Sequence, residues 1–348
     1  MKKRGLAVGA AIGRLKGGLR RANELGIGFS REPQRIFFNG MARARQIAAF
    51  FSRVLKKRNF GRLDDFFFRR ERLPPGGKEY WFIYAASTQG DKKQLVLTFG
   101  RSDAKTTVNS RVADAQNVAA VGWLYSGKKK VFLEKSLPLE CEKGSLKAGA
   151  FSFTGAYPSY ELAIGNKTRI RFSKPKKGGA YEAQAASPST LGVGLLTIHC
   201  DAEGTIDGKK FKGTGYVQKV AVVAPFIPWN WARIVFSDRS VLDVFVASLR
   251  MRGLNYNVKN TGTYRLASGK TYWLKNASFK RLPGGHWLLE GKGYAAYMKD
   301  YAYHPFVLRG RGEFHYDEYM VECEDFAFDG FSKKSGIGLF ENAYGFMV

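Results

Sequence analysis

The most informative part of the sequence for the fold runs from Gly213 to Phe245. It reads Gly213-Thr-Gly-Tyr-Val-Gln-Lys-Val220, then a crossover with Pro225 and Pro228, then Trp229-Asn-Trp-Ala-Arg-Ile-Val235 and, after a turn, Val241-Leu-Asp-Val-Phe245. Aromatic and β-branched residues alternate with small or polar ones on both sides of the crossover, as in half-buried strands. Proline lacks the N–H that a central strand needs. One β domain is therefore expected to end at residue 224 and another to begin at 225.

The regions on either side show the same sequence pattern, from about residue 60 to the C-terminus. Short apolar or alternating runs are separated by clusters of Gly, Pro, Asp and Ser that suit hairpin turns. About seventeen strands are predicted, which is too many for one small barrel and suits two antiparallel barrels or sandwiches. They are Tyr80–Ala86, Gln94–Phe99, Ala119–Tyr125, Val131–Glu134, Ala150–Gly155, Tyr160–Ile164, Arg169–Phe172, Leu191–Cys200, Phe211–Val223, Ala232–Phe236, Val241–Leu249, Thr263–Leu266, Thr271–Arg281, Trp287–Ala296, Phe306–Tyr316, Tyr319–Phe328 and Gly336–Tyr344.

The composition excludes two broad classes of protein. Of the 348 residues, 45% are hydrophobic and 14% aromatic, which supports a sizeable core and argues against intrinsic disorder. No segment approaches the roughly 18 uncharged apolar residues of a transmembrane helix. Lys and Arg number 57 against 29 Asp and Glu, a net charge of +28, so the molecule attracts anionic polymers or lipid headgroups.

The first 60 residues carry much of this positive charge. They contain 15 basic and 2 acidic residues, and residues 1–58 read as two helical stretches around a break at Gly26–Pro33. The second stretch, Met41–Arg58, has apolar residues at near-helical spacing with Arg and Lys between them, which indicates a basic amphipathic helix. Such a helix packs on the protein's own body, lies on an anionic membrane surface or contacts nucleic acid, and all three interpretations are open.

These patterns divide the chain into a basic helical extension over residues 1–60, a first barrel over 61–224 and a second over 225–348. The N-terminus imitates a secretory signal, but Arg14 and further basic residues follow where cleavage should occur. Three scattered cysteines give no disulfide framework. A cytoplasmic protein is expected, and the membrane interpretation would place it peripherally at a membrane through residues 1–58.

No motif announces a cofactor or a reaction. The sequence has no nucleophile elbow, Walker loop, zinc-protease helix or dinucleotide fingerprint, and its cysteines and histidines lack metal-ligand spacing. No metal and no cofactor are therefore expected. The acidic run over residues 313–330 is interpreted as a solvated face or as a docking surface for the basic N-terminus.

Lysine clusters indicate an alternative partner, single-stranded nucleic acid. Lys128–Lys130, Lys174–Lys177 and Lys209-Lys210 fall in predicted hairpin tips next to aromatic strands. Together they would form a basic, aromatic groove. Lysines at hairpin tips also simply keep a protein soluble, so nucleic-acid binding is the secondary interpretation.

The Gly213–Phe245 stretch resembles the carotenoid 1,2-hydratase (hydroxyneurosporene synthase) family and its lipocalin-like double-barrel relatives. In that family a Gly-x-Gly-Tyr strand is followed, after a Pro-containing crossover, by Trp-x-Trp-x-Arg and a turn. Lys78–Tyr84 looks like the family's opening Glu-aromatic hairpin, and Gly336–Gly345 looks like its closing Gly-x-Gly-x-x-Glu strand. The resemblance spans roughly residues 62–348. It implies two lipocalin-like antiparallel β-barrels in tandem, with an apolar ligand site within or between them.

The resemblance also implies a lipophilic, isoprenoid-like ligand, since the family includes hydratases that add water across an isoprenoid double bond, as well as pericyclases. Alkene hydration needs a strong proton donor and aromatic faces that stabilise a carbocation. Asp243 and Glu341 interrupt apolar strands and are the candidate catalytic residues. Each also has a structural interpretation, Asp243 as a solvent-facing strand residue and Glu341 as the ion-pair partner of Arg233.

Six further residues form the candidate ligand-binding set. Trp229, Trp231 and Arg233 alternate along one predicted strand and therefore share one face. For the two tryptophans core packing and ligand contact are both open, and Arg233 is either a stacked structural residue or the anchor for an anionic head group. Gln218 stands where the family often carries His or Asp. The full set is Tyr216, Gln218, Trp229, Trp231, Arg233 and Tyr344. Whether the protein catalyses a reaction, only binds, or is a membrane-docked scaffold is left open.

Overall fold

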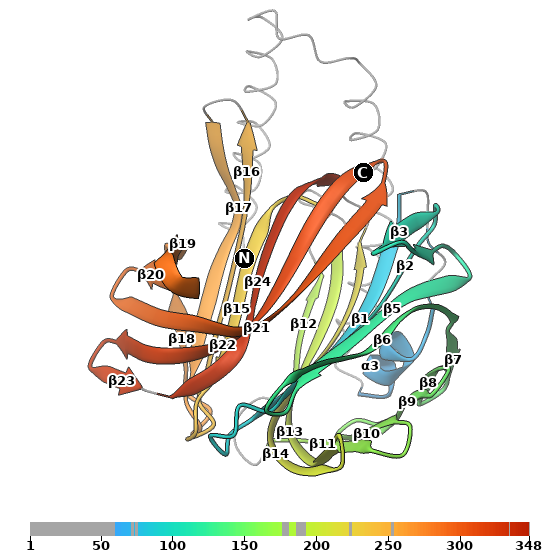
Figure 1. The fold of residues 1–348 in the computed structure, drawn as a ribbon, viewed down its shortest axis with the longest axis horizontal. Coiled ribbons are helices and arrows are strands. Elements are labelled where there is room, and N and C mark those ends of the chain that lie inside the picture. Colours follow the sequence, from blue (N-terminus) through green and yellow to red (C-terminus); the bar gives the residue numbers. More distant parts are fainter. Residues whose placement is uncertain are drawn as a thin grey trace, which may run out of the picture.

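The computed structural model describes residues 60–70, 73, 76–175, 181–185, 193–222, 225–251, 254–333 and 335–347. Apart from one α-helix, α3 (Phe60–Phe67), and a 3-10 turn, this part of the chain is built of strands in two large antiparallel sheets (Figure 1). The predicted all-β, two-barrel fold class is confirmed. The helices expected over residues 1–58 lie outside the described residues.

The first sheet curls into a nearly closed barrel. Its strand order is β6-β5-β2-β1-β14-β13-β11-β10-β9-β8-β7, with β12 paired to β13, and its two edge strands follow one another in the chain. Its strands are β1 (Lys78–Ser87), β2 (Gln94–Ser102), β5 (Asn117–Tyr125), β6 (Lys129–Pro138), β7 (Glu140–Glu142), β8 (Ser145–Ala148), β9 (Phe151–Ala156), β10 (Ser159–Ile164), β11 (Thr168–Ser173), β12 (Tyr181–Ala185), β13 (Val193–Ile206) and β14 (Lys209–Val222).

The second sheet has the order β18-β17-β16-β15-β24-β22-β21-β20-β19, with β23 paired to β22 and the β3–β4 hairpin paired to β21. The hairpin comes from the first half of the chain, so the two halves are interlocked. The strands of the second sheet are β3 (Thr106–Val108), β4 (Arg111–Ala113), β15 (Trp229–Val235), β16 (Val241–Met251), β17 (Leu254–Arg265), β18 (Thr271–Leu274), β19 (Ser278–Leu282), β20 (His286–Gly291), β21 (Tyr294–Gly310), β22 (Gly312–Phe328), β23 (Phe331–Lys333) and β24 (Gly336–Met347).

Helix α3 closes one end of the first barrel. Phe66 and Phe67 are buried in the barrel core, and the ring of Phe67 lies 5.4 Å from that of Phe153. The carbonyls at the end of the helix are satisfied from inside the barrel, because Trp81 Nε1 donates to Phe67 O and Lys219 Nζ to Phe66 O, both at 2.7 Å. A cation is favourable at this negative end of the helix.

The outer face of the first barrel packs on one face of the second sheet. Strands β1, β2 and β5 are therefore covered on both faces, and β1 has one half-buried residue, Tyr80, among ten. Such strands read as almost continuous apolar runs. Gln94, fully buried, crosses the interface and donates from Nε2 to Gly338 O at 3.1 Å. This shared layer is a third apolar cluster, separate from the interiors of the two sheets.

Several predicted strand boundaries are wrong. The predicted strand Thr271–Arg281 is divided into β18 and β19, and the predicted strand Trp287–Ala296 contains the turn between β20 and β21. The sequence pattern predicts strands Phe306–Tyr316 and Tyr319–Phe328 with a turn between them, whereas the chain turns at Gly310–Gly312 and continues through residues 317–318 as the middle of β22. At Gly312 φ is +116°, and a Cβ would lie 2.4 Å from Phe346 O, so only glycine fits this turn. The correction moves Glu318 from a turn into the centre of the sheet.

Candidate functional site

A band of polar and aromatic side chains lies on the face of the second sheet that meets the first barrel. Adjacent strands bring Glu318 of β22, Glu341 of β24 and Trp231 of β15 side by side in one row, because Glu318 is paired with Glu341 and Glu341 with Trp231 in the strand register. Directly opposite residues have Cβ atoms about 4.5–5.5 Å apart. Arg233 and Asp243 form a pair in the next row.

Glu341 is a buried carboxyl in an aromatic environment. Its exposed fraction is 6%, Trp229 Nε1 donates to its Oε2 at 3.2 Å, and Tyr316 is its second hydrogen-bond partner. Burial raises the pKa of Glu341 to about 8, and the negative charge of Asp243 raises it slightly further. The hydrogen bonds from Tyr316 and Trp229 act in the opposite direction and lower the pKa. The side chain is therefore largely protonated at neutral pH and can give up a proton.

Glu318 is the second buried carboxyl, and the sequence pattern does not single it out. It lies within the acidic run 313–330, which the sequence predicts to be a solvated face, but its side chain is fully buried and Trp123 Nε1 of the first barrel donates to its Oε2 at 2.5 Å. Burial, and then the charge of Glu341, raise its pKa well above the usual range. A signal was present, because Glu318 alternates with Tyr316 and Met320 on an apolar strand face.

Asp243 belongs to the same band but has a different environment. It accepts hydrogen bonds from Trp231 Nε1 and from Arg233, both at 2.8 Å. Arg233 is 1% exposed, and its guanidinium lies 4.5 Å from the ring centre of Tyr216 across the interface. Arg233 therefore pairs with Asp243 and not, as the structural interpretation had it, with Glu341. Asp243 is held as the counter-ion of a buried cation.

The remaining predicted residues divide between the two faces of the sheets. Tyr216 is buried, its ring lies 5.3 Å from that of Trp231, and Gln218 Nε2 donates to its hydroxyl at 2.7 Å. Tyr344, by contrast, is 43% exposed and stacks on His315 at 4.8 Å. Tyr344 and Glu341 are three residues apart on β24, so their side chains point to opposite faces of the sheet. The structure thus places seven of the eight predicted site residues at the interface and Tyr344 outside it.

His304 extends the row by one more strand. It is paired with Glu318 in the register of β21 and β22, and its ring lies 5.7 Å from that of Trp123. Burial, and then Lys129, lower the pKa of His304 to about 4, so it is neutral at pH 7. No group of three or more His, Cys, Asp or Glu side chains suited to a metal ion occurs among the described residues.

The arrangement combines a proton donor with aromatic surfaces. Trp229 donates to Glu341 and Trp123 to Glu318, and burial raises the pKa of both carboxyls. Aromatic faces attract cationic carbon as they attract ammonium groups. Residues 225–230, at the crossover into β15, are half-buried. Such a site is chemically suited to protonating an apolar, electron-rich ligand. The described residues contain no helix long and apolar enough to cross a membrane.

Comparison with known proteins supports the fold but identifies no family. No protein-family model and no curated protein matches the chain. Among solved structures, the chain is similar to a protein from Nitrosomonas europaea provisionally identified as AttH, with a TM-score of 0.51 and 15% identity over 76% of this chain and 91% of that one. It also matches kievitone hydratase from Nectria haematococca, with a TM-score of 0.41 and 12% identity over 79% and 91% of the two chains.

A third match is CghA with Sch210972, with a TM-score of 0.47 and 11% identity over 78% of this chain and 89% of that one. Only the first similarity exceeds a TM-score of 0.5, and at 15% identity it shows the fold alone. The chain has a lipocalin-like double-barrel fold. Its activity has to be argued from the side chains described above.

Proposed function

We propose that the protein binds a lipophilic, unsaturated ligand at the interface between the two barrels and protonates it from Glu341. One observation carries the proposal: Glu341 is almost completely buried among aromatic residues, with a pKa raised to about 8. A carboxyl kept neutral at pH 7 in this way is unusual and is typical of general acids. The carotenoid hydratase resemblance of the 213–245 motif supports an acyclic isoprenoid as the ligand.

The reaction proposed is hydration of a carbon–carbon double bond. The carboxyl of Glu341 gives its proton to one alkene carbon, the carbocation left on the other carbon is stabilised by the rings of Trp229 and Trp231, and water adds to it. The proton lost by that water returns to the Glu318–Glu341 pair. No electrons are gained or lost overall, and the acid is regenerated. Arg233 and Asp243 hold Trp231 in place through the hydrogen bond to its indole N–H.

The first experiment is organic extraction and mass spectrometry of gently purified wild-type protein, the Trp229→Ala/Trp231→Ala variant and the Tyr344→Phe control. A stoichiometric apolar compound that is lost in the tryptophan variant and kept in the control supports the site. A wild-type protein that extracts empty argues against a tightly bound ligand there, and the turnover assay then decides alone.

The turnover assay uses squalene as an acyclic isoprenoid probe in ¹⁸O-labelled water. Wild-type protein is expected to add labelled water, and Glu341→Gln to lower the rate by about 10²- to 10⁴-fold, which is the usual contribution of a general acid. Tyr344→Phe should leave the rate unchanged. Equal rates in wild type and Glu341→Gln would sink the catalytic assignment, and ligand binding without turnover in either would reduce the function to binding.

We also propose, from the charge of residues 1–60, that the protein associates with anionic membranes. Basic side chains near a lipid surface contribute about 1 kcal/mol each. Sedimentation with phosphatidylserine vesicles should fall when residues 1–58 are removed and should be unchanged in the Tyr344→Phe control. Unchanged sedimentation of the shortened chain would exclude this role. Nucleic acid remains the alternative partner, and competition by oligo(dT) at low salt tests it.

A further inference from the structure

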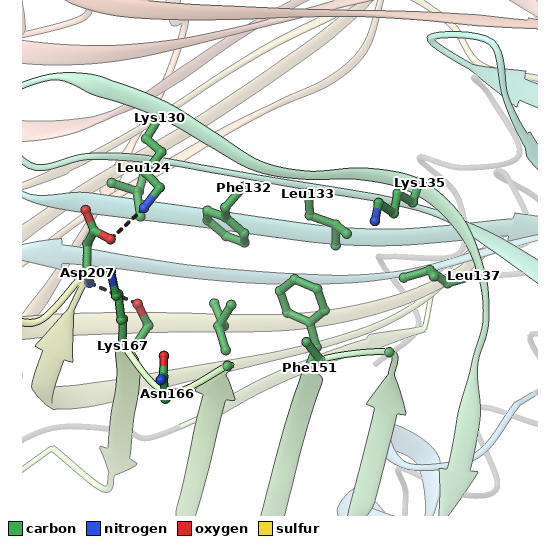
Figure 2. A pocket seen from close by; sticks show the side chains of 15 residues that line it. Leu124, Lys130, Phe132, Leu133, Lys135, Leu137, Phe151, Asn166, Lys167 and Asp207 are labelled. Carbon is green, nitrogen blue, oxygen red and sulfur yellow. Dashed lines mark hydrogen bonds and ion pairs between the residues drawn. The ribbon is translucent and has the colours of Figure 1, made fainter.

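Strand β6 presents two faces of different character. Leu133, Lys135 and Leu137 line a cavity of about 360 Å³ at the seam of the first barrel (Figure 2). Glu134 alternates with them and therefore points to the opposite face, where the second sheet lies. Asn109 Nδ2 donates to its Oε1 at 2.6 Å, and 30% of the Glu134 side chain is exposed. Glu134 is thus a carboxyl at the outer edge of the interface.

His304 is the next polar side chain inward. Its Nε2 lies 3.9 Å from Glu134 Oε1, which is too long for a hydrogen bond but short enough for a small side-chain rotation to close. His304 is 7% exposed, and its Nε2 has no hydrogen-bond partner in the part of the chain that the structure describes. The ring lies 5.7 Å from that of Trp123 and 4.9 Å from that of Phe306. The imidazole is therefore held by packing, and its Nε2 is available to a proton.

Glu318 lies directly opposite His304 in the register of β21 and β22, where Cβ atoms are about 4.5–5.5 Å apart. Its Oε2 accepts the hydrogen bond from Trp123, whereas its Oε1 is buried and has no hydrogen-bond partner among the described residues. Buried polar atoms in proteins are almost always hydrogen-bonded. Two exceptions on directly opposite residues indicate that these side chains do more than hold the fold together.

The groups around His304 keep its imidazole neutral. Burial lowers the pKa of His304 to about 4, and Lys129 acts in the same direction while Glu134 acts in the opposite one. The Nζ of Lys129 donates to the backbone oxygen of Tyr303. A neutral imidazole has one nitrogen that carries a proton and one that accepts a proton, so it can pass protons between groups on its two sides. An imidazolium with so low a pKa readily gives its proton to a carboxylate.

The row ends at the candidate acid. Glu318 is paired with Glu341 in the register of β22 and β24, and Tyr316 is a further neighbour of Glu318. Four side chains from four strands thus lead from solvent into the interface: Glu134, His304, Glu318 and Glu341. A carboxyl enclosed between two sheets exchanges protons with solvent through groups of this kind, because apolar side chains neither donate nor accept protons.

We propose that His304 is a proton relay, which connects the Glu318–Glu341 pair to solvent by way of Glu134. A proton bound by Glu134 moves to one nitrogen of His304, the transient imidazolium gives a proton to Glu318, and Glu341 takes it from there. His304 is neutral before and after the transfer, and no electrons are gained or lost. The part of the relay in turnover rests on the proposed role of Glu341, whereas the exchange of protons with solvent does not depend on turnover.

The test measures proton exchange directly. Rapid-mixing infrared spectroscopy follows the C=O stretch of protonated carboxyls after the full chain is transferred from H₂O to D₂O at pH 7. The variant Glu318→Gln/Glu341→Gln lacks both carboxyls of the pair and therefore identifies their band. Thermal unfolding confirms that each variant is folded.

Three further variants separate the relay from a structural role. His304→Phe keeps a packed ring next to Trp123 but removes both nitrogens. Glu134→Gln removes the outer carboxyl at a partly exposed position, where folding is easily maintained. His315→Phe is the matched control, because it makes the same change three residues from Glu318 on the opposite face of β22.

Wild-type protein and His315→Phe should exchange the band alike. His304→Phe should exchange it about 10²-fold more slowly, at the low end of what a positioned acid–base group contributes, and Glu134→Gln should also be slower than wild type. Added imidazole should restore part of the rate in His304→Ala, since it can enter the space that the ring leaves. A purely structural role of His304 predicts no such recovery.

Two results would overturn the relay while the carboxyl band is present: equal exchange rates in wild type and His304→Phe, or an equal loss of rate in His315→Phe. A wild-type protein without the band would contradict the proposed function itself, and the relay would then have no acid to supply. If the band is present, exchange depends on His304 and squalene is not hydrated, the relay is supported and the hydration chemistry is wrong.

Discussion

Buried carboxyls occur in two regions of this molecule, and their neighbours differ. Inside the first barrel, Glu79 is fully buried and ion-paired with Lys219 at 2.8 Å and with Arg101 at 2.6 Å. At the interface, Glu318 and Glu341 face each other and are met by the N–H groups of tryptophans instead of cations. A buried glutamate is thus part of a structural ion cluster in one region, whereas in the other region burial without a cation raises the pKa of Glu318 and Glu341.

The difference follows from the cost of burying charge. A buried carboxylate is tolerated when cations and hydrogen bonds compensate it, as they do for Glu79 next to the end of α3. Without a nearby cation, the neutral carboxyl has the lower free energy, so the pKa of the buried glutamate is raised. Four substitutions test this comparison, and they are given in order of decreasing effect.

Glu79→Gln should be the most destabilising. It leaves Lys219, which is fully buried, without its counter-ion, and breaking a buried pair in this way costs about 3–5 kcal/mol. Urea denaturation followed by tryptophan fluorescence measures the loss. Glu161→Gln, which removes an exposed pair with Arg169, is the control and should change little. A Glu79 variant as stable as this control would show that the cluster is not needed for the fold.

Asp243→Asn should cost about 2 kcal/mol, because it leaves the guanidinium of Arg233 with a neutral partner while Asp243 itself is partly solvated. The measurement is the same denaturation series. A double variant with Arg233→Met should recover part of the loss, since the uncompensated cation is then gone. No recovery would mean that the two residues act independently of their ion pair.

Glu341→Gln should change the pH dependence of stability more than stability itself. Between about pH 4.5 and 8 the folded chain keeps the proton of Glu341 that the unfolded chain releases, so the free energy of unfolding falls as pH rises through this window. One such group contributes at most about 1.4 kcal/mol per pH unit. The variant should be close to wild type at pH 5 and more stable at pH 8.

Denaturation at several pH values from 5 to 9 measures this slope. Glu318 remains in the Glu341→Gln variant, so part of the slope should persist, and Glu318→Gln/Glu341→Gln should remove most of it. Parallel curves for wild type and both variants would contradict the assignment of neutral carboxyls at the interface.

Tyr344→Phe should have the smallest effect. The side chain lies outside the interface, where it stacks on His315 and is 43% exposed. Loss of its hydroxyl should change stability by less than about 0.5 kcal/mol, as usual for surface positions, and should not affect turnover of squalene. A large loss of turnover in a stable Tyr344→Phe protein would place the reaction on the other face of β24.

The local sequence pattern was sufficient to predict part of the candidate site. The alternation of Trp229, Trp231 and Arg233 predicted that they share one face, and the register of β15 confirms it. Glu341 stood out because it interrupts an apolar strand. Glu318 did not, because a sequence pattern of acidic residues at 313–330 looks solvated unless the turn is known to be at Gly310–Gly312.

The all-β class follows from local sequence patterns, since period-two alternation and turn residues act over a few neighbours at a time. The same patterns also identified Glu341 and the tryptophans as candidates. Which residues meet depends on the three-dimensional packing, because Trp123 contacts Glu318 and Tyr216 contacts Arg233 across an interface between strands far apart in the chain. That contact removes water from the carboxyls, and the loss of water is what keeps them protonated.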